Sequence, residues 1–339
     1  MLIRAKAPLR ISFAGGGTDV APFPEREGGL VLNATINRYA YGTLRPREDD
    51  LLQIRSLDYG LTAEFAAHEP LVFDGKLDLA KAAIRRIAGE EVRGFDLLLH
   101  SNAPPGSGLG ASSAMMVALI GMLKEFRTLP MTDYELAELA HDVERHELGI
   151  NGGRQDQYAA AFGGVNFIEL YGDHVVVNPL RVAPDVMLEL EHNLLLCYTG
   201  ITRQSDHIIA DQRARYERSD SEALAGLRAQ KELAVEMKNA LLQRRLGDFG
   251  DLLHTAWEAK KRMSDRISNP RIEQLYAEAR AAGAIGGKVT GAGGGGFVLL
   301  YCRYDRKHEV AARMIELGAT VDEFGFEASG LRTWRVDDD

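Results

Sequence analysis

A glycine-rich stretch at residues 104–114 constrains this chain more than any other feature. It reads Pro-Pro-Gly-Ser-Gly-Leu-Gly-Ala-Ser-Ser-Ala and lies between a predicted strand, Phe95–His100, and a predicted helix, Ser112–Phe126. Glycines let the backbone turn tightly and bring N–H groups against an anion, and a helix N-terminus adds partial positive charge. The stretch therefore predicts a phosphate-binding loop, with a flexible turn of small residues as the alternative.

The loop matches neither of the two commonest nucleotide motifs. No Gly-Lys-Ser/Thr closes it, as a Walker A loop requires, and no strand and loop of the dinucleotide-binding type lie near the N-terminus. The loop by itself indicates phosphate and nothing narrower.

Two further glycine clusters lie on either side of this stretch along the chain, one near each end. In Arg10–Asp19, a predicted strand ends in three glycines followed by Thr18 and Asp19. An aspartate there can accept hydrogen bonds from vicinal sugar hydroxyls, or it can simply cap a helix. The second cluster, Gly286–Gly296, holds more glycines than a plain hairpin needs, and their entropic cost favours close approach to a ligand or to the first loop.

The chain has 339 residues, more than one hydrophobic core usually serves, so two domains are expected. Strand-like and helix-like segments interleave in both halves, and Pro179 and Pro184 mark a boundary. We predict domains at residues 1–180 and 181–339. One predicted helix, Thr132–Leu148, opens with a capping box, and Leu331–Val336 is predicted to be the final strand.

Composition narrows the function classes. Hydrophobic residues make up 45% of the chain and charged residues 26%, and the net charge of −9 argues against a nucleic-acid partner. No apolar stretch reaches the ~20 residues that span a bilayer, and the N-terminus lacks a signal peptide's apolar segment. We expect no membrane partner and a cytoplasmic location. Cys197 and Cys302 lie in apolar runs and are expected to be reduced core thiols.

The three glycine-rich segments, in this order and spacing, resemble the three motifs of the GHMP kinases, the class that contains galactokinase, homoserine kinase and mevalonate kinase. The resemblance covers essentially the whole chain. Within the class, Gly-Gly-Gly-Thr-Asp at residues 15–19 is similar to the heptose 7-phosphate kinases and the kinase domain of fucokinases. The resemblance implies an α+β, two-domain fold with mixed or antiparallel sheets and the phosphate loop before a helix.

The resemblance also implies roles for individual residues. Ser112 and Glu144 would bind Mg²⁺, with Glu147 as the nearby competitor. Asp156 would be the catalytic carboxylate, although Asn151–Asp156 lacks the proline found in relatives, and Arg10 would be its cationic companion. ATP would be bound by the loop residues Pro105, Gly106, Ser107, Gly108, Leu109, Gly110, Ala111, Ser112 and Ser113.

On the substrate side, the resemblance implies sugar contacts from Gly16, Gly17, Thr18, Asp19, Gly293 and Gly294. Arg154 and Arg203 are the candidate cations for a substrate phosphate, and either can instead be an ordinary surface arginine.

The implied activity is ATP-dependent phosphorylation of the C1 hydroxyl of D-glycero-D-manno-heptose 7-phosphate, a small sugar phosphate, for surface-polysaccharide precursors. The alternatives are a C1 kinase of a free sugar, such as L-fucose or galactose, and a sugar- and ATP-binding sensor without catalysis. Turnover with each sugar distinguishes the three.

Overall fold

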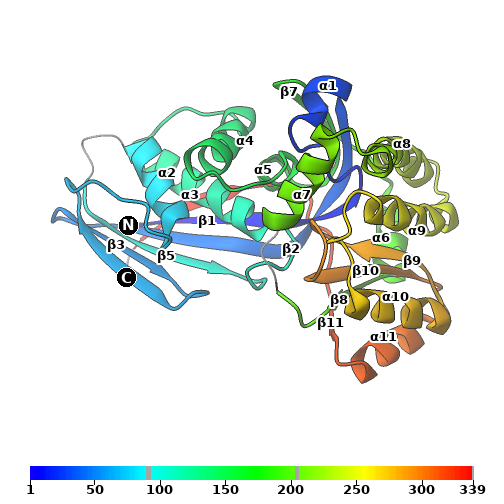
Figure 1. Cartoon of the computed structure of the whole chain (residues 1–339). Coiled ribbons are helices and arrows are strands. Elements are labelled where there is room, and N and C mark those ends of the chain that lie inside the picture. The colour runs from blue at the N-terminus through cyan, green and yellow to red at the C-terminus, as the bar shows by residue number, and fades with distance from the viewer. Residues whose placement is uncertain (89–92, 203–205, 338–339) are drawn as a thin grey trace.

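The computed structural model describes residues 1–88, 93–202 and 206–337, and two β-sheets with helices packed on them organise this part of the chain (Figure 1). The larger sheet has eight strands in the order β12-β1-β2-β5-β3-β4, with β6 paired to β2 and β7 to β6. Its strands are β1 (Leu2–Ala14), β2 (Gly29–Pro46), β3 (Leu51–Ser56), β4 (Leu61–Ala66), β5 (Phe95–Ser101), β6 (Val165–Tyr171), β7 (His174–Pro179) and β12 (Arg332–Val336).

The smaller sheet has the order β11-β8-β10-β9. Its strands are β8 (Leu194–Tyr198), β9 (Ala284–Val289), β10 (Phe297–Cys302) and β11 (Thr320–Asp322). Among the described strands, β3 and β5 pair in parallel and the other pairs are antiparallel. The predicted α+β class with mixed sheets is therefore confirmed.

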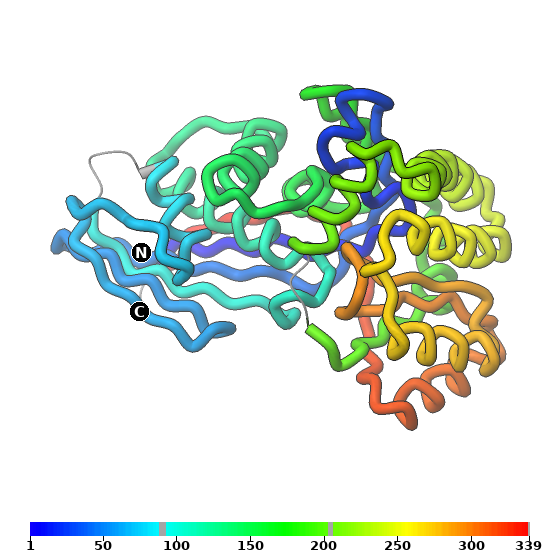
Figure 2. The backbone as a smooth tube through the Cα atoms, viewed as in Figure 1, coloured from blue at the N-terminus to red at the C-terminus, as the bar shows by residue number. Residues whose placement is uncertain are grey.

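Helices cover both sheets, as the tube in Figure 2 shows. The larger sheet carries a layer that includes α3 and α5, whereas on the smaller sheet α9 and α10 pack on β9, and α11 packs on β8 and β11. The helices are α1 (Phe23–Glu27), α2 (Asp78–Ala88), α3 (Ala111–Arg127), α4 (Asp133–Asp142), α5 (Gln155–Phe162), α6 (Pro184–Asn193), α7 (Asp206–Glu217), α8 (Ser221–Leu242), α9 (Leu246–Lys261), α10 (Pro270–Ala282) and α11 (Lys307–Glu316). Among the helices described, none combines the length and apolar character needed to span a membrane.

The alternation of β1 sends neighbouring side chains to opposite faces. Leu9, Ile11 and Phe13 are fully buried in the main core, and the ring of Phe13 lies 5.2 Å from that of Phe249 on α9. Arg10 and Ser12, on the other face, are also buried, at 6% and 3% exposure. One strand therefore supplies both core packing and two polar groups for a site.

The helix predicted at Thr132–Leu148 is divided in two. Thr132 and Glu135 form the predicted capping box of α4, but the last turn widens into a π-helix, η1 (Val143–Glu147). The N–H of Leu148 donates to the carbonyl of Val143, five residues earlier. Such π-helical turns rotate the following side chains away from the ordinary helical register, and here Glu144 is fully buried.

The end of the chain returns to the first sheet. The predicted final strand is β12, and it pairs antiparallel with β1, from Leu2 opposite Val336 to Lys6 opposite Arg332. The domain boundary at residue 180 stays a prediction. The final strand, which lies within the predicted second domain in sequence, belongs to the larger sheet formed by the first half of the chain.

We predict that Gly330→Ala lowers the free energy of unfolding by about 2–4 kcal/mol. A Cβ on Gly330 would lie 1.9 Å from the carbonyl oxygen of Ala161, which accepts a hydrogen bond from the N–H of Leu331, so the approach to β12 must shift. Gly247→Ala is the control, because its Cβ meets nothing within 4 Å at an exposed position of α9. Urea unfolding measures both, and equal stability of the two variants would contradict the role of this contact.

Candidate active site

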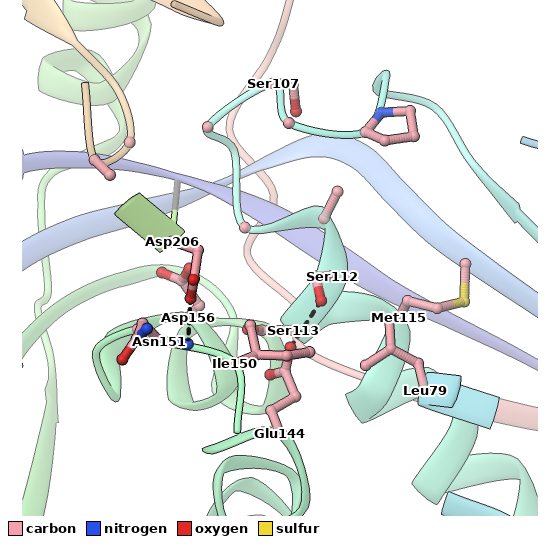
Figure 3. Close-up of a pocket in the computed structure, with 18 of the residues that line it drawn as sticks. Leu79, Ser107, Ser112, Ser113, Met115, Glu144, Ile150, Asn151, Asp156 and Asp206 are labelled. Carbon is pink, nitrogen blue, oxygen red and sulfur yellow. Dashed lines mark hydrogen bonds between the residues drawn. The ribbon is translucent and has the colours of Figure 1, made fainter. Parts of the chain in front are cut away.

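A cavity of about 1010 Å³ lies where the two halves of the chain meet. The end of β1, the loop before α3 and the loop before α5 line it from the first half, and Lys260, Thr290 and Gly291 line it from the second. Figure 3 shows Ser112 and Glu144 facing each other along one wall, with Asp156 nearby. All three predicted motifs contribute to this one cavity.

The loop between β5 and α3 needs its glycines for conformational reasons. Gly106, Gly108 and Gly110 have φ values of +73°, +81° and +77°, a region that residues with a Cβ rarely adopt. Gly110 is the N-cap of α3, so the first-turn residues Ser112 and Ser113 follow directly at the positive end of the helix. This geometry fits the predicted phosphate loop.

The third glycine cluster, Gly286–Gly296, packs against this loop. A Cβ on Gly291 would lie 2.6 Å from the Cα of Gly108, and the N–H of Phe297 donates to the carbonyl of Ser107 at 3.0 Å. Backbone therefore packs on backbone, which explains why side chains are excluded here.

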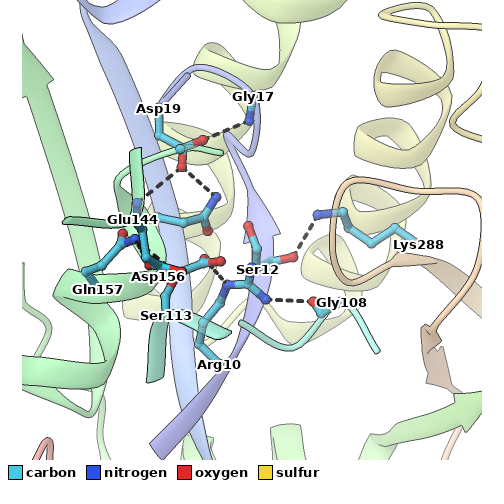
Figure 4. A network of polar contacts seen from close by, with 12 residues as sticks. Arg10, Ser12, Gly17, Asp19, Gly108, Ser113, Glu144, Asp156, Gln157 and Lys288 are labelled. Carbon is cyan, nitrogen blue, oxygen red and sulfur yellow. Dashed lines mark hydrogen bonds and ion pairs between the residues drawn. The ribbon is translucent and has the colours of Figure 1, made fainter. Parts of the chain in front are cut away.

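Arg10 joins the loop to the predicted catalytic carboxylate. Its Nε donates to Oδ1 of Asp156 at 2.6 Å, and its Nη1 donates to the carbonyl of Gly108 at 2.7 Å (Figure 4). The second oxygen of Asp156, Oδ2, accepts no hydrogen bond from a described residue, and a Cβ on Gly110 would lie 3.4 Å from it. The structure thus brings Arg10, Asp156 and the loop together.

Ser112 and Glu144 are also brought together. The Ser112 hydroxyl donates to Oε1 of Glu144 at 2.8 Å, and the amide of Gln157 donates to Oε2. Glu147, the competing candidate, instead pairs with Arg86 on the surface. Of the two glutamates, Glu144 is the one in the cavity.

Asp19 is held by protein donors. Its carboxylate accepts hydrogen bonds from the N–H of Gly17 and from both the N–H and the side-chain amide of Gln155. Gly16, Gly17 and Asp19 line the cavity as predicted. Thr18 does not: it is fully buried, and its hydroxyl donates to the carbonyl of Gly15 to shape the turn.

Several predicted contacts lie away from the cavity. The Arg154 guanidinium donates to the carbonyl of Gly172 and to Asp173, which directs it to a surface loop. Gly293 packs on the backbone of Ile267, and Gly294 donates its N–H to the Ile267 carbonyl.

Leu109, predicted with the loop, turns its side chain into the core, and its carbonyl accepts from the N–H of Arg10. Arg203 lies outside the described residues.

The sequence analysis did not predict two cationic side chains in the cavity wall, those of Arg145 and Lys260. Arg145 donates to the carbonyls of Ile150 and Gly153 and to Ser113, so it holds the loop before α5. Lys260, only 4% exposed, makes no hydrogen bond with any described residue. Burial lowers the pKa of Lys260 to about 8, although nearby Asp19 opposes this shift.

A signal for Lys260 was present in the sequence. It continues the buried helical stripe formed by Phe249, Leu253, Ala256 and Trp257, and a lysine in such a stripe is rarely buried without a purpose.

The chain matches two family models and a relative of the same length. The model of the GHMP kinases N terminal domain matches residues 78–164, and that of the GHMP kinases C terminal domain matches residues 237–320. The D-glycero-alpha-D-manno-heptose 7-phosphate kinase of Campylobacter jejuni is 38% identical over 338 residues, covering 98% of this chain and 99% of that protein.

Solved structures are similar over the same length. A crystal structure of a D-glycero-D-manno-heptose 1-phosphate kinase from Bacteroides thetaiotaomicron has a TM-score of 0.83 at 35% identity, covering 99% of this chain and all of that one. The galactokinase of Lactococcus lactis, complexed with galactose, has a TM-score of 0.76 at 22% identity, covering 98% of this chain and 95% of that one. The second likeness shows the fold alone.

We predict that Gly291→Ala raises the KM for Mg²⁺-ATP by roughly tenfold or more, because the added Cβ meets backbone atoms of Gly108 and must displace the loop. Steady-state kinetics measure the change, with Gly247→Ala as the control at a position without neighbours. An unchanged KM for ATP would show that the packing of Gly291 on the loop has no part in nucleotide binding.

Proposed function

The chain belongs to the GHMP kinases and is an ATP-dependent sugar kinase, and we propose that it phosphorylates the anomeric C1 hydroxyl of D-glycero-D-manno-heptose 7-phosphate. The product would be the 1,7-bisphosphate, a precursor for surface polysaccharide. Phosphoryl transfer depends mainly on positioning and on charge neutralisation, and the protein supplies little covalent chemistry.

The ion pair of Arg10 and Asp156 beside the phosphate loop is the observation that carries the proposal. Asp156 uses one oxygen for Arg10, which leaves Oδ2 to accept the proton of a sugar hydroxyl. Arg10 also donates to the carbonyl of Gly108, so it fixes the distance between the Asp156 carboxylate and the loop. Asp19 has acceptor capacity left on Oδ1 for a second hydroxyl of the sugar.

The residues of this wall fit a magnesium ion that arrives with ATP. Among the described residues, no group of three or more His, Cys, Asp or Glu side chains could hold a metal by itself. Mg²⁺ is usually bound by one or two carboxylates plus substrate phosphates and water. Glu144 offers one carboxylate and Ser112 one hydroxyl, and the hydroxyl oxygen lies 2.8 Å from Oε1 of Glu144. When bound, the ion would neutralise charge on the β- and γ-phosphates.

The names of two similar proteins differ in the position of the phosphate on the heptose. One relative is named a heptose 7-phosphate kinase and another a heptose 1-phosphate kinase. We propose the C1 hydroxyl of the 7-phosphate because the Campylobacter jejuni relative has the higher identity, 38% against 35%.

An ADP-release assay with Mg²⁺-ATP tests this function. The acceptors are heptose 7-phosphate, heptose 1-phosphate, mannose 6-phosphate, L-fucose and galactose, and phosphorus NMR locates the new phosphate. We expect heptose 7-phosphate to give the highest kcat/KM and the phosphate to appear at C1. Asp156→Asn should lower kcat by about 10²- to 10⁴-fold, because the proton acceptor is lost.

Other outcomes separate the alternatives. Preference for heptose 1-phosphate would reverse the position, and preference for fucose or galactose would replace the substrate. Binding of sugar and ATP without turnover would identify a sensor.

The metal assignment gives a matched pair of variants. We predict that Glu144→Gln raises the Mg²⁺ concentration needed for half-maximal activity by at least about tenfold, since a carboxylate ligand is lost. Glu147→Gln should behave as wild type, because Glu147 contacts Arg86 on the surface. Calorimetry of ATP binding at several Mg²⁺ concentrations gives a second measurement, and equal effects of the two variants would reject Glu144.

A further inference from the structure

One end of the cavity holds polar groups that the proposed chemistry leaves unused. They surround Gly16, whose missing side chain leaves space between three elements. A Cβ on Gly16 would lie 3.3 Å from the hydroxyl oxygen of Ser12 on β1, 3.6 Å from Nε2 of Gln155 on α5, and 3.8 Å from Nζ of Lys260 on α9. Polar groups from both halves of the chain thus meet above one glycine.

Nε2 of Gln155 donates to Asp19, but other polar atoms at this end of the cavity lack protein partners. The Ser12 hydroxyl, Oε1 of Gln155 and Nε2 of Gln212 are buried without a hydrogen bond, although all three residues line the cavity. The Lys260 ammonium, as described above, has no hydrogen-bond partner among the described residues. A buried polar atom without a partner costs about 1–3 kcal/mol, and a charged one costs more. Such a cluster is built for a ligand that supplies the missing partners.

The surrounding charges select the kind of ligand. Asp19 is the strongest opposite charge acting on Lys260, and Asp156 also attracts it. A phosphate can only accept hydrogen bonds at neutral pH, and here it would face the Asp19 carboxylate and Oε1 of Gln155. A hydroxyl accepts from an ammonium and donates to a carboxylate or an amide oxygen at the same time.

We propose that Lys260 and Gln155 bind one hydroxyl of the acceptor sugar, in the space above Gly16. The hydroxyl oxygen accepts from the Lys260 ammonium, and its proton is donated to Oε1 of Gln155 or to Asp19. This proposal rests on the proposed sugar-kinase function and goes further, because it makes Lys260 a determinant of which sugar is accepted. The substrate phosphate is then held elsewhere.

The protonation of Lys260 gives the proposal a pH signature. With a pKa of about 8, the side chain is charged at neutral pH and loses its proton above that value. The charged groups that face it are Arg10 on β1, Asp19 after β1, Asp156 on α5 and Lys288 on β9. The KM for sugar should therefore rise as the pH passes 8.

The test compares wild type, Lys260→Met and Lys261→Met. Lys261 is the matched control, because the neighbouring lysine pairs with Glu258 and Glu273 at the surface. The acceptors are heptose 7-phosphate, its analogues with one hydroxyl removed in turn, and the heptose without phosphate.

We expect Lys260→Met to raise the sugar KM by about 10- to 100-fold, the loss typical of a hydrogen bond from a charged group. The KM for ATP should stay unchanged. One deoxy analogue should lose affinity in the wild type and lose nothing further in Lys260→Met, whereas removing the phosphate should cost the same factor in both enzymes. An unchanged sugar KM, or a phosphate effect that disappears in Lys260→Met, would overturn the proposal.

Two readouts separate binding from a structural role. The rise in sugar KM above pH 8 should be present in wild type and Lys261→Met and absent in Lys260→Met. The melting temperature of Lys260→Met should not fall, because the lysine is buried and makes no hydrogen bond with the described part of the chain. A lower melting temperature with equal losses for every analogue would mean that Lys260 is structural.

A direct binding measurement keeps this proposal distinct from the proposed function. If wild type phosphorylates no sugar, the function fails, and calorimetry without ATP then tests binding of heptose 7-phosphate, mannose, L-fucose and galactose. A sugar that binds to wild type and Lys261→Met but not to Lys260→Met supports the subsite. Equal binding to all three proteins, or no binding of any sugar, overturns it.

Discussion

The contacts of Arg10 hold the parts of this site in register. Its guanidinium donates to Asp156 on α5 and to the carbonyl of Gly108 in the predicted phosphate loop, and its own N–H donates to the carbonyl of Leu109. The residue lies on β1 opposite Thr35 of β2, and this pairing together with the bond to Leu109 leaves its backbone little freedom. Charge-assisted hydrogen bonds away from water are short and strong. One side chain therefore sets the separation between the loop and the carboxylate, the quantity on which transfer between two bound groups depends.

The second half of the chain completes the site through backbone contacts and lysines. Gly291 packs on Gly108, and Lys288 on β9 donates to the carbonyl of Ser12 on β1. Lys288 is fully buried, and burial lowers its pKa well below the ordinary value. The site is thus built at the junction of the halves, and its geometry depends on how the small sheet docks against β1. Buried polar groups are costly, and their concentration here indicates that the cavity is organised for a ligand.

Local chemistry explains why much of the fold could be predicted. The capping box of Thr132 and Glu135, the alternating strand β1 and the phosphate loop each depend on neighbours close in sequence. Glycines with positive φ in that loop follow from a steric rule that needs no tertiary context. The same reasoning could not foresee the π-helical turn that holds the buried Glu144, since the contacts of that turn come from α2 and from Ser112 and Gln157, which are distant in sequence.

The sequence by itself determined the three glycine-rich segments, and through them the resemblance to a family that implied the pairing of Arg10 with Asp156, because these depend on motif residues and their order along the chain. The tertiary structure decided which of the cationic side chains line the cavity. Arg154 lies close to Asp156 in sequence yet contacts Asp173, and Lys260 lies more than a hundred residues from Asp156 along the chain yet faces the cavity. The physical reason is that side-chain direction and burial depend on long-range docking, of α9 against β1 and of β12 onto the first sheet, which no local pattern encodes.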